Sequence, residues 1–420
     1  MPEQQQLLVK PLGNDAAYAL FLRARERETH QTELDLAAAR DLYADAIAAD
    51  PSVAEAHACY ARLLATFGDA AKAKLEATEA LRLNPDLGEA HFALSRIYEV
   101  ERDYAAAVPE IEMAERASPT DSDIIYAAAS LHRRQGKWQQ SLAEFQKAVT
   151  LNPRNFDGPT NLAYHLSLMR DWPAAIAAWD RALAIVPEYM FNKIARAYVD
   201  FWSRGELRRG KALLASYPPE YAGQFKEFLA WMRWDFNLLE RDYPAAEQAV
   251  ANINQDPVDG GFLGPITRSY MRGCIALAQG NREAATPLFA ESCKFFEERV
   301  RKTPNRAQPH MRLAMTYAFM GQKEDALREE AKATELCPES KDTFDGAVVS
   351  TARPVVYAWT GESDKAIAEL ARLLRTPGAL NYDCSITLND LKYRWLWDPL
   401  RTDPRFQQIV AGAEPQTIVP

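Results

Sequence analysis

Arginine is the residue type whose spacing in this chain most directly suggests a binding chemistry. Arg62 and Arg96 stand at the same place in two successive segments of a sequence repeat, and Arg133 with Arg134 stands one step further along. A guanidinium group presents its N–H donors in a planar fork that matches a carboxylate. A row of such groups suits an acidic peptide, so these arginines are candidates for a binding strip. The alternative is that each arginine forms an ion pair with an acidic residue near it: Glu55, Glu89 or Asp123.

The other reactive residue types form no catalytic motif. The sequence has no phosphate-binding glycine loop, no H-E-x-x-H and no glycine-flanked nucleophilic serine. A metal site needs three or four converging ligands, and the six histidines do not cluster in sequence. We therefore predict a protein without catalytic residues, cofactor or metal. The five cysteines are scattered, odd in number and never arranged as C-x-x-C, which favours free thiols and a cytoplasmic location.

Proline marks the elements that would position these side chains. Five prolines recur at one constant interval, and a later pair has the same spacing. They are Pro51, Pro85, Pro119, Pro153 and Pro187, then Pro304 and Pro338. A period of this length indicates stacked structural repeats. Because proline restricts the residue before it and stops a helix, each one marks the end of a unit.

Small and bulky residues recur with the same period. Small residues repeat at the positions of Ala73 and Ala80, where two crossing helices leave no room for a larger side chain. Bulky residues such as Phe145 and Trp179, again one period apart, fill neighbouring positions. These residues together resemble the tetratricopeptide repeat (TPR), a unit of two antiparallel helices. The resemblance covers most of the chain and implies an all-α, right-handed superhelix of about ten helix pairs with a C-terminal capping helix.

Both ends of the chain resemble one group of bacterial TPR proteins. The elements Trp397–Arg401 and Asp403–Phe406 look like that group's closing segment, and Ala17–Arg25 with Ala46–Ala61 looks like its first units. In that group a TPR array follows a kinase, winged-helix or cyclase domain, none of which is recognisable here. The resemblance implies a non-catalytic scaffold or sensory module in bacterial signalling. Two alternatives stay open: a regulatory subunit of a separately encoded enzyme, and an enzyme with its active site in the irregular residues 188–265.

The concave face of a TPR stack is the surface that this resemblance implies for binding a peptide or helix. Fixed positions of the first helix in each pair line that face. Read onto this sequence, they give the candidate groove residues Arg62, Arg96, Tyr126, Ser130, Arg133, Arg134 and Tyr164. Ala58 and Arg62 stand where a chaperone-type carboxylate clamp has lysine and asparagine, so that specialised function is not expected. His57, His91 and His310 share another position of the first helix, where we expect a packed imidazole.

Charge and hydropathy restrict the partner. Lysine and arginine number 49 against 58 aspartates and glutamates, a net charge of −9, which argues against nucleic acid or an anionic membrane. No apolar run approaches the roughly 20 residues of a membrane helix, and the N-terminus lacks the features of a signal peptide. The predicted partner is therefore a protein or peptide, and the arginines favour an acidic one.

The same patterns divide the chain into five segments. Residues 1–14 form a polar lead-in, and 15–254 form a first array that ends in two degenerate, aromatic-rich pairs. Residues 255–265 are a glycine- and proline-rich break or hinge. Further TPR units occupy 266–376, and 377–420 is a capping segment over the last repeat. The aromatic residues of 198–236 form either a widened core or an exposed binding face.

Overall fold

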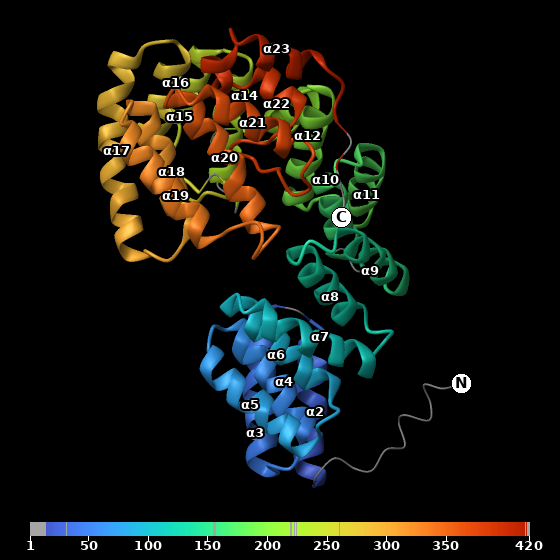
Figure 1. Ribbon diagram of the computed structural model, residues 1–420. Helices are drawn as coiled ribbons and strands as arrows, with labels where there is room; N and C mark the ends of the chain where they lie inside the picture. The colour runs from blue at the N-terminus through green and yellow to red at the C-terminus, as the bar shows by residue number, and fades with distance from the viewer. Residues whose placement is uncertain are drawn as a thin grey trace. The chain divides into compact units, whose positions relative to one another are not determined.

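A computed structural model describes residues 14–30, 32–153, 157–218, 221, 223, 225–259, 261–415 and 417. Within these ranges every regular element is a helix, and the β structure is limited to one isolated bridge. The predicted all-α fold is therefore confirmed (Figure 1). Of the predicted lead-in, only Asn14 lies among the described residues. Its side chain accepts a hydrogen bond from the Ala17 N–H and caps the first helix.

Ten consecutive helix pairs make up most of the described chain, as the repeat predicted. They are α2 (Asp15–Glu28) with α3 (Glu33–Ala49), α4 (Ala54–Thr66) with α5 (Ala70–Leu83), α6 (Gly88–Glu101) with α7 (Tyr104–Ala117), α8 (Ser122–Arg134) with α9 (Trp138–Leu151), α10 (Asp157–Leu168) with α11 (Trp172–Ile185), α12 (Met190–Arg204) with α13 (Arg208–Ser216), α14 (Lys226–Leu239) with α15 (Tyr243–Ala251), α16 (Arg268–Ala278) with α17 (Arg282–Lys302), α18 (Ala307–Met320) with α19 (Lys323–Leu336), and α20 (Asp345–Trp359) with α21 (Ser363–Leu373). The short helices α22 (Leu388–Tyr393), η1 (Trp395–Leu400, a 3₁₀ helix) and α23 (Pro404–Ala411) follow.

The turn inside a pair is built on a residue in the left-handed conformation. The first four of these recur with the period of the repeat: Gly68, Arg102, Gly136 and Arg170, with φ of 86°, 60°, 79° and 58°. Glycine adopts this conformation without strain, whereas a residue with a Cβ is strained by about 1–2 kcal/mol. Arg102, Arg170 and the later Arg241 (φ 62°) therefore occupy positions that glycine would fill more easily.

Aspartate commonly follows the turn and begins the second helix. Asp69, Asp103, Asp171 and Asp242 each accept a hydrogen bond from the backbone N–H three residues further on. This satisfies one of the amide groups that a helix start leaves without a partner. In the pairs that have both features, the left-handed turn and the N-cap together explain why the chain reverses at a fixed point.

Three histidines connect the helices of a pair to the proline that precedes it. Nδ1 of His57, His91 and His310 lies 2.6 Å from a glutamate 19 residues later, respectively Glu76, Glu110 and Glu329. Nε2 lies 3.0–3.1 Å from the carbonyl oxygen of the repeat proline six residues earlier. Both ring nitrogens of each histidine therefore lie within hydrogen-bond distance of an oxygen atom. The repeat prolines thus also supply hydrogen-bond acceptors.

The helices form two compact units. Unit 1 comprises residues 1–133 with 140–152, and unit 2 comprises 134–139 with 153–420. Residues 255–265, for which the sequence predicts a break or hinge, belong to unit 2. There the backbones of Val258 and Ile266 exchange hydrogen bonds of 2.8 and 2.9 Å, and both side chains are buried with that of Leu263. These apolar residues hold the loop against the core, which the count of glycines and prolines did not anticipate.

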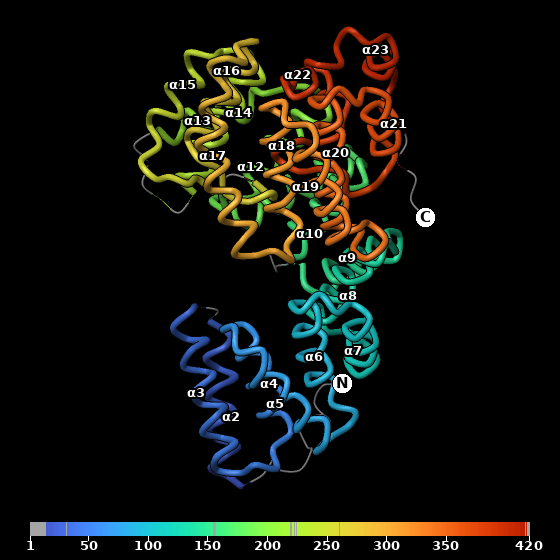
Figure 2. The backbone as a smooth tube through the Cα atoms, turned by 60° about the vertical axis from the view of Figure 1, so that its left-hand side comes forward, coloured from blue at the N-terminus to red at the C-terminus, as the bar shows by residue number. Residues whose placement is uncertain are grey.

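The two units differ in how their cores are built. In unit 1 the buried residues form several small clusters rich in alanine, each shared by neighbouring helices. In unit 2 they form one continuous cluster that includes the aromatic residues of α12 and α14 and residues of the C-terminal segment. Figure 1 shows α22 beside α12, with which it is in contact, and Figure 2 shows the same helices from another side. The aromatic stretch is therefore mainly a widened core, with Tyr198, Trp231 and Phe236 almost fully buried.

Candidate functional site

The first helices of unit 1 surround a polar hollow of about 440 Å³, which we call the unit 1 hollow. Its walls come from the end of α2, from α4 and α6, and from the start of α8. The lining residues are Arg25, Glu26, Glu28, Thr29, Arg62, Glu89, Phe92, Asp121 and Asp123. Five carboxylates therefore stand against two guanidinium groups.

Arg62 is the central cation of this hollow and joins three first helices. From α4 its Nε donates to Glu89 Oε1 on α6 at 2.8 Å, and its Nη2 donates to Glu28 Oε1 on α2 at 2.5 Å. The other oxygen of Glu28 accepts a hydrogen bond of 2.7 Å from the Tyr43 hydroxyl. Burial lowers the pKa of Arg62, but Glu89 and Glu28 together raise it above its ordinary value. Arg62 is thus a permanent charge engaged on both sides.

Arg25 and Cys59 lie beside this network. Arg25 Nη1 is 3.8 Å from the Cys59 sulfur, which is 3.9 Å from Glu89 Oε1. Burial, reinforced by Glu89, raises the pKa of the Cys59 thiol to about 12. Because the thiolate is the nucleophile, Cys59 is a packing residue with a weak S–H donor rather than a reactive group.

The pattern of ion pairs changes one repeat further along. Arg96 occupies the repeat position of Arg62, and Asp123 that of Glu89. Arg96, however, pairs with Glu99 on its own helix. Asp123 consequently forms no ion pair with any residue in the described part of the chain. Partial burial and then the nearby Asp121 raise the pKa of the Asp123 carboxyl, despite the opposing influence of Arg62.

Three carboxylates of the hollow have no cationic partner among the described residues: Glu26, Asp121 and Asp123. Asp121 accepts the backbone N–H groups of Asp123 and Ile124 at 2.9 and 3.3 Å, which fixes the start of α8. Arg62 is already bound by Glu28 and Glu89. The hollow would therefore bind a positively charged group more favourably than a negatively charged one.

The candidate groove residues are divided between the two units. In unit 1 only Arg62 of this set lines the hollow, and the side chain of Arg96 is 43% exposed. Tyr126 packs edge to face on Phe145 at 5.7 Å, and the guanidinium of the buried Arg133 lies 5.6 Å from the same ring. Ser130 is buried in α8.

The remaining two candidates belong to unit 2 and meet at Phe344. The Arg134 guanidinium lies 5.1 Å from that ring and pairs with Asp342 at 2.7 Å and Asp345 at 3.4 Å. The Tyr164 ring packs against Phe344 at 6.0 Å. Within unit 2, these contacts connect residues far apart in sequence.

The corresponding face of unit 2 is covered by residues 377–400 of the same chain, here called the C-terminal segment. Its polar contacts reach the first helices of several pairs. Gly378 N–H donates to the Leu168 carbonyl of α10, Asn389 donates to the Trp202 carbonyl of α12, and Trp359 of α20 donates to the Leu396 carbonyl, at 2.8–3.0 Å. The sequence predicted that residues 377–420 cap the last repeat. The segment extends further because its Trp, Tyr and Leu side chains complete the core.

Arginines at two left-handed turns hold this end of the chain. Arg170 is buried and donates to the carbonyls of Leu373, Leu374, Thr376 and Ile386 at 2.9–3.1 Å. Burial lowers the pKa of Arg170 to about 10, while Glu414 acts to raise it. Leu373 and Leu374 lie at the end of α21, where a helix leaves carbonyl groups available to donors outside the helix. Arg241 forms a bidentate pair with Asp398, at 2.7 and 2.6 Å.

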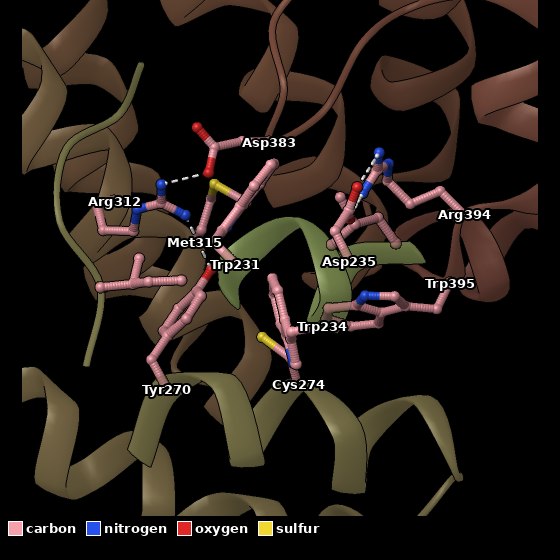
Figure 3. Close-up of a pocket in the computed structure, with 12 residues that line it drawn as sticks. Trp231, Trp234, Asp235, Tyr270, Cys274, Arg312, Met315, Asp383, Arg394 and Trp395 are labelled. Atoms are coloured by element: carbon pink, nitrogen blue, oxygen red, sulfur yellow. Dashed lines mark hydrogen bonds and ion pairs between the residues drawn. The ribbon is translucent and has the colours of Figure 1, made fainter. Parts of the chain in front are cut away.

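Figure 3 shows a second polar cavity, a narrow pocket between α14, α16, α18 and the C-terminal segment. Two ion pairs lie on opposite sides of it: Arg312 with Asp383 at 2.6 Å, and Arg394 with Asp235. Its volume of about 20 Å³ is enough for roughly one water molecule. The paired charges and small volume indicate that this cluster positions the C-terminal segment.

Sequence reasoning missed the contribution of α2 to the unit 1 hollow. The insertion between α2 and α3 obscured the period there, although Glu28 stands one period before Arg62 and Arg25 stands one period before Cys59. Subtracting one period from Arg62 would have found its partner. The sequence contains a weaker indication of the roles of Arg170 and Arg241. Each is an arginine at the turn position that Gly68 and Gly136 occupy in other pairs.

Within the described ranges, no group of three or more His, Cys, Asp or Glu side chains is arranged to hold a metal ion. None of the described helices combines the length and the apolar character needed to span a bilayer.

Comparison with known proteins adds solved structures that share the helix-pair architecture. No family model matches the sequence, and no curated protein matches it. A TPR protein of Thermus thermophilus is 17% identical and covers 44% of this chain and 98% of its own length, with a TM-score of 0.39. A tetratricopeptide repeat protein from Parabacteroides merdae is 14% identical over 66% of this chain and 93% of its own, with a TM-score of 0.39. The type IV pilus biogenesis factor PilW is 16% identical over 51% and 98%, with a TM-score of 0.44. At these values none of the three is a guide to what this chain binds.

Proposed function

We propose that this chain is a non-catalytic protein-interaction scaffold that takes an extended segment of a partner protein into the unit 1 hollow. The observation that carries the proposal is the contrast between the units. In unit 2 the C-terminal segment covers the first helix of several pairs. The unit 1 hollow, in contrast, has a volume of about 440 Å³ and contains three carboxylates that form no ion pair with a described residue. A surface with unsatisfied charge in a TPR-type array is suited to binding a peptide.

The partner segment carries basic side chains in this proposal. The arginine pattern of the sequence favoured an acidic partner, but Arg62 is already neutralised by Glu28 and Glu89. Glu26, Asp121 and Asp123 would gain most from a lysine or arginine of the partner, which could replace the missing ion pairs at the α6–α8 step.

A cytoplasmic role in bacterial signalling belongs to the same proposal. The five cysteines are free and buried, which suits a reducing compartment. If the chain is instead the regulatory subunit of a separately encoded enzyme, it would use the same hollow to bind that one enzyme rather than several different proteins.

The test is an array of unrelated peptides incubated with the full chain at low salt and again at physiological salt. We expect lysine- and arginine-containing peptides to be retained and the retention to fall with salt, because exposed charges are screened over roughly 8–10 Å. Asp123→Asn should weaken the affinity for the best peptide roughly fivefold. This corresponds to the loss of one partly exposed ion pair, which contributes about 1 kcal/mol.

The matched control is Asp45→Asn, an exposed aspartate on α3 that does not line the hollow. Its binding should equal that of the original chain. Retention of acidic peptides alone, or equal binding by the Asp123 and Asp45 variants, would contradict the proposal.

A further inference from the structure

A cavity lined mainly by aromatic rings lies in unit 2, away from the unit 1 hollow. We call it the aromatic chamber. It has a volume of about 380 Å³, within the range of small-molecule sites. Its lining residues are Phe191, Phe225, Glu227, Phe228, Asp259, Gly261, Phe262 and Tyr382. They come from α12, from α14 and the turn before it, from the loop 255–265 and from the C-terminal segment.

Tyr382 of the C-terminal segment fixes the geometry of this chamber. Its ring centroid lies 5.3 Å from Phe228 in an edge-to-face arrangement and 5.7 Å from Phe262, nearly parallel at 11°. Behind it, Tyr198 lies at 4.7 Å and Trp202 at 5.7 Å. Tyr382 is 4% exposed, whereas Phe262 is 36% exposed. The chamber thus has a rigid floor and an open aromatic wall.

Phe262 is held over Tyr382 by a polar anchor next to it. The N–H of Leu263 donates to Asp383 Oδ2 at 3.3 Å, and Asp383 Oδ1 accepts from Arg312 at 2.6 Å. A Cβ at Gly261 would lie 2.2 Å from the Asp383 carboxylate, so the loop approaches this closely only with glycine there. Loop and C-terminal segment are therefore locked together beside the chamber.

The charges at the chamber are negative. Glu227 and Asp259 are carboxylates, and neither forms an ion pair with a residue in the described ranges. None of the eight described lining residues is basic. Arg299 of α17 interacts electrostatically with Asp259 but does not line the chamber. Aromatic faces carry partial negative charge, and they attract organic cations within about 6 Å of the ring centroid.

We propose that the aromatic chamber binds an alkylated ammonium group. Such a group buries its methyl groups against the rings of Phe191, Phe228 and Phe262 while its charge is balanced by Glu227 and Asp259. Aromatic faces with nearby carboxylates favour a diffuse cation over both a neutral apolar group and a strongly hydrated one. A free quaternary amine and a trimethylated lysine of a protein share this chemistry. The inference does not depend on the unit 1 hollow.

The test compares two ligands of equal shape on the full chain. Choline carries a trimethylammonium group, and 3,3-dimethylbutan-1-ol is its uncharged isostere. We expect choline to bind at least tenfold more tightly by calorimetry, with its N-methyl proton resonances moved upfield by the aromatic rings. A trimethyl-lysine peptide titrated in parallel identifies the source: tighter binding than choline indicates a protein side chain, and weaker binding indicates a free amine.

Glu227→Gln should weaken choline at least threefold and leave the neutral isostere unchanged. Glu335→Gln, an exposed glutamate on α19 whose side chain is 70% accessible, is the matched control and should have no effect. Phe228→Leu keeps an apolar side chain but removes a ring face, and should weaken choline more than its isostere. Equal binding of choline and the isostere, or no binding of choline and of the peptide, would overturn the proposal. Those two comparisons use the unaltered chain, so the result does not depend on whether a variant folds.

Discussion

Three arginines of this chain use the same guanidinium fork in three different ways. Arg62 connects carboxylates on two other helices, Arg170 binds four backbone carbonyls, and Arg394 lies between Asp235 and Asp390. The first is in a hollow that still contains water-accessible carboxylates. The other two are buried, where a charged group is costly unless hydrogen bonds and opposite charges compensate for the water that it loses. The function of each arginine therefore follows from its acceptors rather than from its position in the repeat.

We expect Arg170→Gly to destabilise the protein more than Arg102→Gly does. Glycine relieves the left-handed strain at both turns. At position 170 it also removes the donor for four carbonyls, so we expect the free energy of unfolding of unit 2 to fall by more than about 2 kcal/mol. At position 102 the relieved strain offsets part of whatever contact the side chain makes, so we expect a smaller fall than at position 170. Urea unfolding of both variants measures this, and equal losses would show that the Arg170 hydrogen bonds contribute little.

Asp390 should make the stability of unit 2 depend on pH in the mildly acidic range. Burial, opposed by Arg394, raises the pKa of its carboxyl from 3.8 to about 6. A group with a raised folded-state pKa binds more protons when folded, so its contribution to stability falls as pH rises from about 4 to about 6 and is constant above that. The difference in unfolding free energy between the original chain and Asp390→Asn should decline over this window.

The control for this measurement is Asp364→Asn, because the Asp364 side chain is 89% exposed. Acidic groups with lowered pKa, such as Asp35 at about 2, act in the opposite direction at lower pH and cancel in the difference. A difference that is constant between pH 4 and 6 would exclude Asp390 as the titrating group.

Among the elements, the C-terminal segment determines how unit 2 is closed. Trp397 and Phe406 are almost fully buried. Replacing each with alanine should cost roughly 3–5 kcal/mol, as for other buried aromatic residues. Hydrogen exchange should rise in residues 340–400 and also in α12 and α14, because these helices are bonded to the segment. Tyr393→Ala, at a ring that is 39% exposed, is the control and should leave exchange in α14 unchanged. An increase confined to α21 and α23 would mean that the segment caps only the last repeat.

The regular pairs could be predicted from the sequence because each depends on residues within one repeat. Pro85, Ala73 and the turn at Gly68 act on neighbours close in the chain, so their period is visible without a structure. The paths of the loop 255–265 and of the C-terminal segment depend on contacts such as Leu263 with Asp383, 120 residues apart. No periodic pattern records such a contact. The α2 side of the unit 1 hollow was missed for a different reason: Glu28 does stand one period before Arg62, but the insertion between α2 and α3 obscures that period.

At the scale of the whole molecule, the chain contains two different kinds of cooperativity. His91→Ala and His310→Ala remove the same contact in units 1 and 2, leaving a glutamate and a proline carbonyl without their partner. Each should cost about 1–3 kcal/mol. Exchange should rise only in α4–α8 for the first variant, because solenoid helices depend on their neighbours. It should rise across α12–α22 for the second, since one core connects these helices. Local responses of equal extent would contradict this.

The reach of residues 377–400 also bears on how such a chain can change length over evolution. A duplicated copy of one repeat inserted at Pro85 or Pro119 would extend unit 1 by one more set of neighbour contacts, and each existing pair would keep its own. The same duplication inside unit 2 would move Arg170, Asp235 and Arg312 relative to the partners that Ile386, Arg394 and Asp383 supply. Unit 1 is therefore open to growth by tandem duplication. Unit 2 has a fixed number of helix pairs, set by the length of its own C-terminal segment.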